Sequence, residues 1–288
     1  MLRLTRAALL GMAGMFVVSG TAWAVPQTTA QQKCIDKINQ NGDKVHEAQG
    51  GNNRACVKSF GKGSLMGTAE ACMTGDVKGK VAKTKAKTIA TEMKFCGGAG
   101  VPDFGFTSAA NVNSVADQAE LDLMHDLFGT PIDPGLFPCN PDTNQCLCQR
   151  NAINRIEKLM AVMPRIFAAC KKAYLTSVFL PAPAASAADL QRCWEDNTFM
   201  PSVASDSGTQ IAQVVTLLNN TLASDCDATS VTALSFTGPK CNGLSGTAAQ
   251  NCINALVRCR TCVMINAEDG LSSNCDMFDN GAADASCP

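Results

Sequence analysis

Sixteen cysteines constrain this chain of 288 residues more than any other feature of its sequence. The first four are placed almost as mirror images about residues 64–65, so folding the chain back there brings Cys56 opposite Cys72 and Cys34 opposite Cys96. This is the spacing of an antiparallel helical hairpin closed by two disulfides. In the chain-entropy model the two bridges stabilise the fold by roughly 4 and 3 kcal/mol. Those amounts are large beside a net stability of about 5–15 kcal/mol.

The first 24 residues have the organisation of a secretory signal peptide. Arg3 and Arg6 precede an apolar run over 7–18, and residues 22–24 read Ala-Trp-Ala, a small-x-small cleavage pattern. That run is too short to span a bilayer comfortably, and no other segment approaches the required length, so we expect no transmembrane segment in the mature chain. Export is predicted, to the periplasm or the extracellular medium. An oxidising compartment allows the 16 cysteines to form eight disulfides.

The spacing of the first hairpin recurs later in the chain. Cys148 and Cys170 are again separated by 21 residues, and Pro164 follows Cys148 by 16 positions, as Gly50 follows Cys34. Because glycine pairs favour turns and proline removes a backbone donor, both positions predict an interruption of the first helix of a hairpin. The recurrence therefore predicts a duplicated unit.

In the second unit, Cys193 and Cys226 mirror Cys170 and Cys148 less closely than the corresponding cysteines of the first unit mirror each other. Ser207, with Gln210 three residues later, forms a capping box that predicts the start of a helix before Cys226. The disulfides predicted for the two hairpins are Cys34–Cys96, Cys56–Cys72, Cys148–Cys226 and Cys170–Cys193.

Two faces are predicted for a long helix over 68–95. The apolar one consists of Ala82, Ala86, Ile89, Met93 and Cys96. The cationic one consists of Lys80, Lys83, Lys87 and Lys94. This lysine face could meet an anionic polymer or lipid, but a solvated helix surface is the favoured interpretation.

The segment between the units, 97–147, contains one clear helical pattern, which starts at Ser114 and stops before Gly129. The following stretch, 138–148, is rich in turn-forming residues, and we expect Cys139 and Cys146 to close it locally.

The C-terminal part is expected to be a cysteine-rich cap. A helix over about 247–266 carries Cys259 and Cys262, and an acidic, irregular tail is expected to bind back to it through Cys275 and Cys287. Cys241 and Cys252 are left without an assigned partner. The predicted fold is all-α, with duplicated disulfide-stapled hairpins, a connecting helix and this cap. The predicted division is 1–24 signal peptide, 25–100 first hairpin, 101–147 connector, 148–228 second hairpin and 229–288 cap.

The cap contains the one motif typical of redox chemistry, the CxxC formed by Cys259 and Cys262. An active pair needs a lowered thiol pKa and usually a thioredoxin-like βαβ setting, and no parallel-strand pattern surrounds it. Structural bridges from both cysteines to the tail are therefore favoured over a redox pair. Covalent haem attachment is excluded, because Val263 stands where histidine would follow.

Metal and cofactor signals are weak. The chain has only two histidines, His46 and His125, and neither stands beside a cysteine at zinc-ligand spacing. Calcium is a minor candidate at Asp276, Asp279 and Asp284, although an EF-hand register would put Phe278 and Cys287 where oxygen ligands belong. No cofactor is predicted.

The charge of the mature chain argues against a general nucleic-acid binder. Without Arg3 and Arg6 the 24 basic residues become 22, against 25 acidic residues, a net charge of −3.

Four segments carry a resemblance: 68–72, 76–83, 266–270 and 274–281. In these segments the chain resembles cysteine-rich exported proteins of environmental bacteria, and the similarity spans most of the mature chain. The resemblance implies export and disulfides. It implies no activity and no functional residue.

Three functions stay open at this stage. The favoured one is a non-catalytic binding or surface-structural module with a cell-surface or extracellular partner. The first alternative is a thiol-disulfide oxidoreductase using Cys259 and Cys262. The second is a lipid- or hydrophobe-binding module, which predicts a cavity between the two hairpins.

Overall fold

The computed structural model describes residues 26–141, 143–176, 183–195, 202–205, 210–226, 235–278 and 287. Within these ranges it is helical and contains no strand. The signal peptide and the Ser207 cap lie outside the described residues. The α-helices are α1 (Thr29–Gly61), α2 (Ala69–Thr74), α3 (Lys80–Phe95), α4 (Ala109–Phe128), α5 (Thr143–Thr176), α6 (Ala187–Gln191), α7 (Gln210–Thr221) and α9 (Gly246–Asp269). The short helices are η1 (Gly98–Gly100), η2 (Asp133–Gly135), η3 (Leu222–Cys226) and η5 (Cys275–Phe278).

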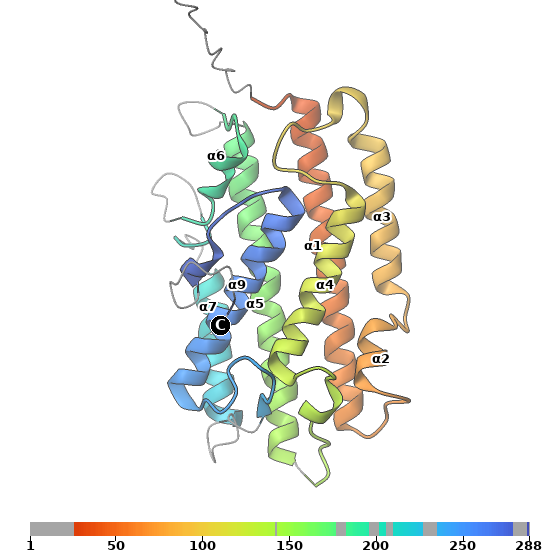
Figure 1. Cartoon of the computed structure of the whole chain (residues 1–288), viewed down its shortest axis with the longest axis vertical. Helices are drawn as coiled ribbons and strands as arrows, with labels where there is room; N and C mark the ends of the chain where they lie inside the picture. The colour runs from red at the N-terminus through yellow and green to blue at the C-terminus, as the bar shows by residue number, and fades with distance from the viewer. Residues whose placement is uncertain are drawn as a thin grey trace, which may run out of the picture.

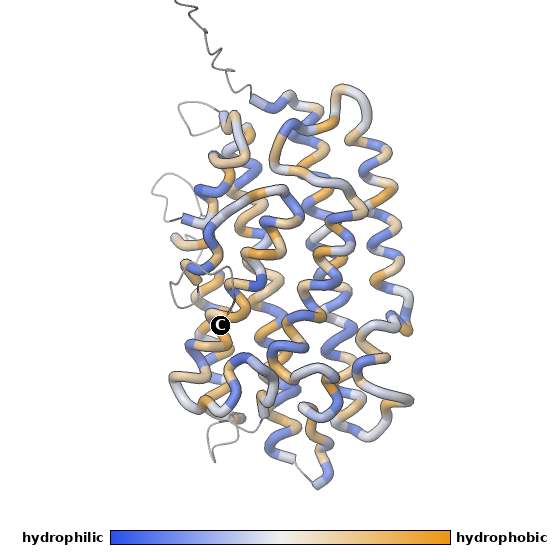
Figure 2. Tube along the Cα trace, in the orientation of Figure 1, coloured by the Kyte–Doolittle hydropathy of each residue, from blue (hydrophilic) through white to orange (hydrophobic). Residues whose placement is uncertain are grey.

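The two longest helices, α1 and α5, run antiparallel along the long axis of the molecule (Figure 1). α1 packs on α3, α4 and α5, and α5 packs in turn on α7 and α9. Along these helices hydrophobic and hydrophilic residues alternate, as amphipathic packing requires (Figure 2). None of the described helices combines the length and apolar character that a membrane crossing requires.

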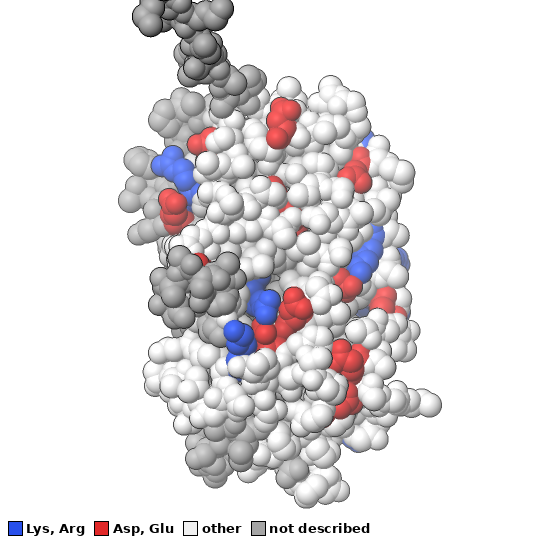
Figure 3. All heavy atoms as spheres, viewed as in Figure 1, with Lys and Arg blue, Asp and Glu red and all other residues white. Residues whose placement is uncertain are grey.

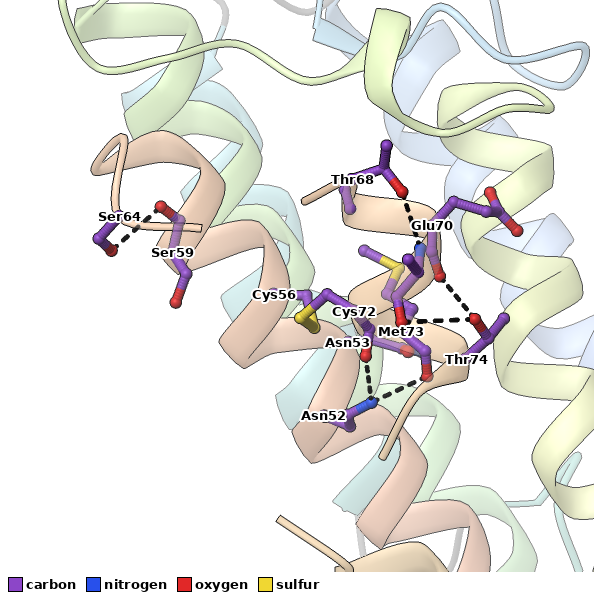
Figure 4. The surroundings of a disulfide bond; sticks show 12 residues. Asn52, Asn53, Cys56, Ser59, Ser64, Thr68, Glu70, Cys72, Met73 and Thr74 are labelled. Atoms are coloured by element: carbon purple, nitrogen blue, oxygen red, sulfur yellow. Dashed lines mark hydrogen bonds between the residues drawn. A yellow bond between two sulfur atoms is a disulfide. The ribbon is translucent and has the colours of Figure 1, made fainter. Parts of the chain in front are cut away.

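The predicted interruption at Gly50 is wrong, because α1 continues through residues 50–53. The polar side chains there bond to neighbouring elements and not to their own backbone. Asn52 donates to the carbonyls of Cys72 and Met73, at 3.1 and 2.8 Å, beside the Cys56–Cys72 disulfide (Figure 4). Tertiary contacts therefore stabilise a segment that its composition disfavours as helix.

The single helix predicted over 68–95 is also wrong. α2 ends at Thr74, and the chain turns before α3 starts after Gly79, whose φ of +61° is a conformation that glycine adopts without steric cost. α3 then buries Val81 and Thr88, whereas Met93 of the predicted apolar face is 74 % exposed. The reason is polar packing, because Asn113 of α4 donates to the Lys85 carbonyl and fixes the rotation of α3.

Two helices begin earlier than predicted. α4 starts after Ser108, whose side chain accepts from the amide of Asn111, and not at Ser114. α5 starts at Thr143, so Cys146 and Cys148 lie on a helix and not in a turn. The predicted interruption at Pro164 is wrong as well, since α5 continues past it.

All 16 cysteines are paired. The bridges include every pair assigned from spacing, and they join Cys241 to Cys252, which the spacing left open. The remaining bridges are Cys34–Cys96, Cys56–Cys72, Cys139–Cys146, Cys148–Cys226, Cys170–Cys193, Cys259–Cys287 and Cys262–Cys275.

Candidate functional site

The interior between α1, α4, α5 and α9 contains ionisable side chains as well as apolar ones. Their side chains are almost fully buried, which is rare for charged residue types unless they are paired. They are His46, Glu120, Glu157, Lys171, Glu268 and Asp269.

The first group brings together one side chain from each of three helices. Nδ1 of His46 on α1 contacts Oε1 of Glu120 on α4. Glu120 also lies beside Glu157 on α5. Glu157 in turn lies 3.8 Å from Arg54 at the protein surface. Gly50 provides the space for these carboxyls, because a Cβ there would lie 1.8 Å from Oε2 of Glu157.

Pro164 has a specific role in this group. In a regular helix the carbonyl of Met160 would accept from the amide of residue 164, but proline has no N–H. The free carbonyl instead accepts a hydrogen bond from Nε2 of His46, at 3.0 Å. The proline therefore gives α5 a buried acceptor for a side chain of α1.

This bond fixes where the protons are. A carbonyl only accepts, so Nε2 of His46 carries a hydrogen. Burial lowers the pKa of His46, so the ring is neutral and its Nδ1 is an acceptor. The proton in the contact with Glu120 then belongs to the carboxyl group. This agrees with the pKa of Glu120, which burial raises to about 8.

Glu157 is held in its neutral form for the same reason. Burial raises its pKa well above the ordinary value, and the neighbouring Glu120 raises it further. At neutral pH the three side chains are therefore an uncharged, proton-sharing network.

The second group lies about one turn away along α1, where α5 and α9 meet. Nζ of Lys171 is 2.6 Å from Asp269 and donates to the carbonyl of Gly105 at 3.0 Å. Glu268 is buried beside this ion pair, and burial raises its pKa well above the ordinary value. Asp43 of α1 completes the group, with its pKa raised to about 6 mainly by burial.

Asp43 and Lys171 also line a groove between α1 and α5 with a volume of about 570 Å³. Its walls are α1 from Thr29 to Asp43 and α5 from Arg165 to Thr176. Most of the surface inside is apolar. This volume lies within the range of sites that bind small organic ligands.

The predicted redox pair is not joined. Cys259 is bonded to Cys287 and Cys262 to Cys275, and all four are buried. Both members of the CxxC motif are thus structural bridges to the tail. A free thiolate, which exchange chemistry needs, is absent among the 16 paired cysteines.

The lysine face is exposed on α3. All four of its side chains are exposed, and Nζ of Lys94 lies 5.2 Å from the centre of the Phe95 ring. On the face of the molecule in Figure 3, acidic and basic side chains are interspersed, with no continuous region of one sign.

Of the calcium candidates, only Asp276 falls within the described residues, and it is buried. Asp279 and Asp284 lie outside them. The described ranges contain no group of three or more His, Cys, Asp or Glu side chains that could hold a metal ion.

Comparisons of the chain with protein-family models, curated proteins and solved structures found no match. What the described residues define is a class: a helical protein with eight disulfides, a buried acid network and a groove between α1 and α5.

Proposed function

We propose that this is a non-catalytic binding protein that takes a small organic molecule with an apolar portion into the α1–α5 groove. The observation that carries the proposal is the groove itself, an apolar-walled cavity of about 570 Å³ between the first helices of the two hairpins. A cavity at this place is what the hydrophobe-binding interpretation of the sequence requires.

The apolar walls come from both helices. Ile35 of α1 faces Ala168, Ala169 and Leu175 of α5 in the groove lining. Alanines at two successive positions keep α5 from filling the space. Transfer of apolar ligand surface from water into such a groove contributes about 25 cal/mol per Å².

Binding of a neutral fluorescent probe such as Nile red tests the proposal. Ala169→Trp fills the groove from its exposed wall, and Ala82→Trp on the distant, exposed surface of α3 is the matched control. We expect saturable probe binding that Ala169→Trp weakens at least tenfold and Ala82→Trp leaves unchanged. Equal binding by both variants would contradict a site in the groove.

We further propose that the groove lies between two copies of a duplicated hairpin. The two nested bridge pairs have similar Cα separations, 5.0 and 5.9 Å in the first hairpin and 5.0 and 5.7 Å in the second. Asp43 follows Cys34 by nine residues and Glu157 follows Cys148 by nine, so each copy places a carboxyl at the same offset. Both of these carboxyls belong to the polar interior.

The same proposal includes export after removal of residues 1–24. It is supported by the complete pairing of 16 cysteines, which an oxidising compartment favours. Cell fractionation with N-terminal sequencing of the mature chain tests this part.

A further inference from the structure

We propose that the ligand of the α1–α5 groove is an amphipathic organic cation, such as an alkylammonium ion, whose charge pairs with Asp43. This assignment rests on the proposed binding function and adds the ligand class to it.

The argument starts from the other charged side chains of the groove, since each cation there already has a partner. Arg165 pairs with Glu47, Lys171 with Asp269 and Lys172 with Asp36, while Lys33 lies over the Phe95 ring. Lys33 is also exposed to water. The basic groups of the lining are therefore neutralised or solvated, and none presents a desolvated positive charge to a ligand.

Asp43 differs from all of them. Among the described residues, no side chain or amide forms a hydrogen bond or an ion pair with its carboxylate. Glu268, a buried acid close to it, is neutral because burial raises its pKa. Asp43 thus has no direct hydrogen-bond or ion-pair partner among the described residues, and a half-buried carboxylate is stabilised by an incoming cation.

Several charged groups act on Asp43 from the helices packed around it. Burial raises its pKa most, Glu47 of α1 and Asp269 of α9 raise it further, and Arg165 of α5 lowers it, as His46 of α1 does in its protonated form. The result is a pKa of about 6, so the carboxylate is mostly ionised above pH 7 and mostly protonated at pH 5.

The shape of the groove provides the apolar part of the site. Asp43 and Arg165 stand at one end of the lining, and its apolar side chains are Ile35 on α1 and Ala168, Ala169 and Leu175 on α5, so the apolar part of the groove lies between Asp43 and Ile35 mainly on the α5 side. Eight residues of helix correspond to a length of about 12 Å. A ligand with a terminal amine and a medium alkyl chain therefore has a place for both of its ends.

Calorimetry with three probes of equal chain length tests the assignment: n-decylamine, n-decanoate and n-decanol, each below its aggregation concentration at pH 7.5. We expect decylamine to bind about tenfold or more tightly than the other two. Asp43→Asn should remove that preference while leaving decanol affinity unchanged. The matched control is Asp117→Asn, which removes a charge paired with Lys85 far from the groove and should leave all three affinities unchanged.

A second measurement uses pH. Lowering the pH from 7.5 to 5 should weaken decylamine binding about tenfold, because Asp43 gains a proton, and should not weaken decanol binding. Decanoate binding as tightly as decylamine, or an Asp43→Asn variant that keeps the preference, would overturn the cation assignment alone. If none of the three probes binds, the proposed groove function fails and the assignment fails with it.

Discussion

Replacing Glu120 by glutamine should make the protein more stable at neutral pH. The carboxyl of Glu120 is fully buried and keeps its proton up to a pKa of about 8, against an ordinary value of 4.5. In the unfolded chain it ionises near 4.5. The folded state therefore binds more protons than the unfolded state between these two values, and stability must fall as pH rises through that interval.

The size of the effect follows from the two pKa values. Each unit of separation corresponds to about 1.4 kcal/mol, so at pH 7 the wild-type protein has lost about 3 kcal/mol relative to pH 4.5. The amide of glutamine can donate to Nδ1 of His46 as the protonated carboxyl does, and it never ionises. Glu120→Gln should thus match the wild type near pH 4.5 and exceed it by about 3 kcal/mol at pH 7. For a chain of this size that is about 6–12 °C in melting temperature.

Differential scanning calorimetry at several pH values between 4.5 and 8 measures the difference. His46, whose pKa burial lowers, contributes the opposite slope, but it does so in both proteins. The control is Glu195→Gln at an exposed position, which should shift the melting temperature equally little at every pH. A Glu120→Gln variant that is less stable by the same amount throughout the range would refute the protonated-carboxyl interpretation.

Two further predictions concern the helices around the network, and a third concerns the disulfides. Gly50→Ala should destabilise the protein by about 1–3 kcal/mol, because the added Cβ would overlap Glu157. Gly51→Ala, at the next position, should stabilise the protein by up to about 1 kcal/mol. Urea titration of the two variants compares their free energies of unfolding. Pro164→Ala restores an amide that competes for the Met160 carbonyl, so the exchange-protected imidazole Nε2–H signal of His46 in the NMR spectrum should be lost. Replacing Cys34 and Cys96 by serine should lower the stability by about 4 kcal/mol, and replacing Cys139 and Cys146 by about 2–3 kcal/mol, because the first bridge closes a longer loop. Thermal melting of the two double variants ranks their stabilities. The reverse order would contradict the loop-closure account.

The cysteine spacing predicts the disulfides well because distances along helices are fixed. Each helical residue advances the chain by about 1.5 Å, so equal numbers of residues on both sides of a turn bring two cysteines level. This arithmetic needs no knowledge of the core. It does not apply to Cys241 and Cys252, which are joined across a loop and a helix start and have no mirror position.

The predicted helix interruptions are wrong because local residue preferences take no account of tertiary contacts. Gly50 and Pro164 are poor helix residues, with a cost of about 1 and 3 kcal/mol in isolated helices. In the folded protein Gly50 makes room for Glu157, and the proline frees a carbonyl for His46. Local signals of this kind therefore mark where helices meet, and here they do not mark where helices end.

The sequence contains a signal of the buried network. Glu120 falls four residues after Ala116 and three before Leu123, both core positions of α4. Glu157 falls in the same way between Ile153 and Met160 on α5. Charged residues in the apolar stripe of a helix indicate buried ionisable sites. That these two side chains and His46 meet could not be predicted, because their contact depends on which helices pack together.

The buried ionisable groups of this protein lower its stability, and its disulfides offset that loss. Ionisable groups held neutral inside a core lower the stability at neutral pH, and natural proteins often retain such groups where function needs them. Here the acid network adjoins the polar end of the groove, because His46 follows Asp43 by three residues on one face of α1. The buried groups therefore lie directly behind the carboxylate that we propose faces a ligand. Eight bridges, each contributing a few kcal/mol, allow the fold to maintain that arrangement.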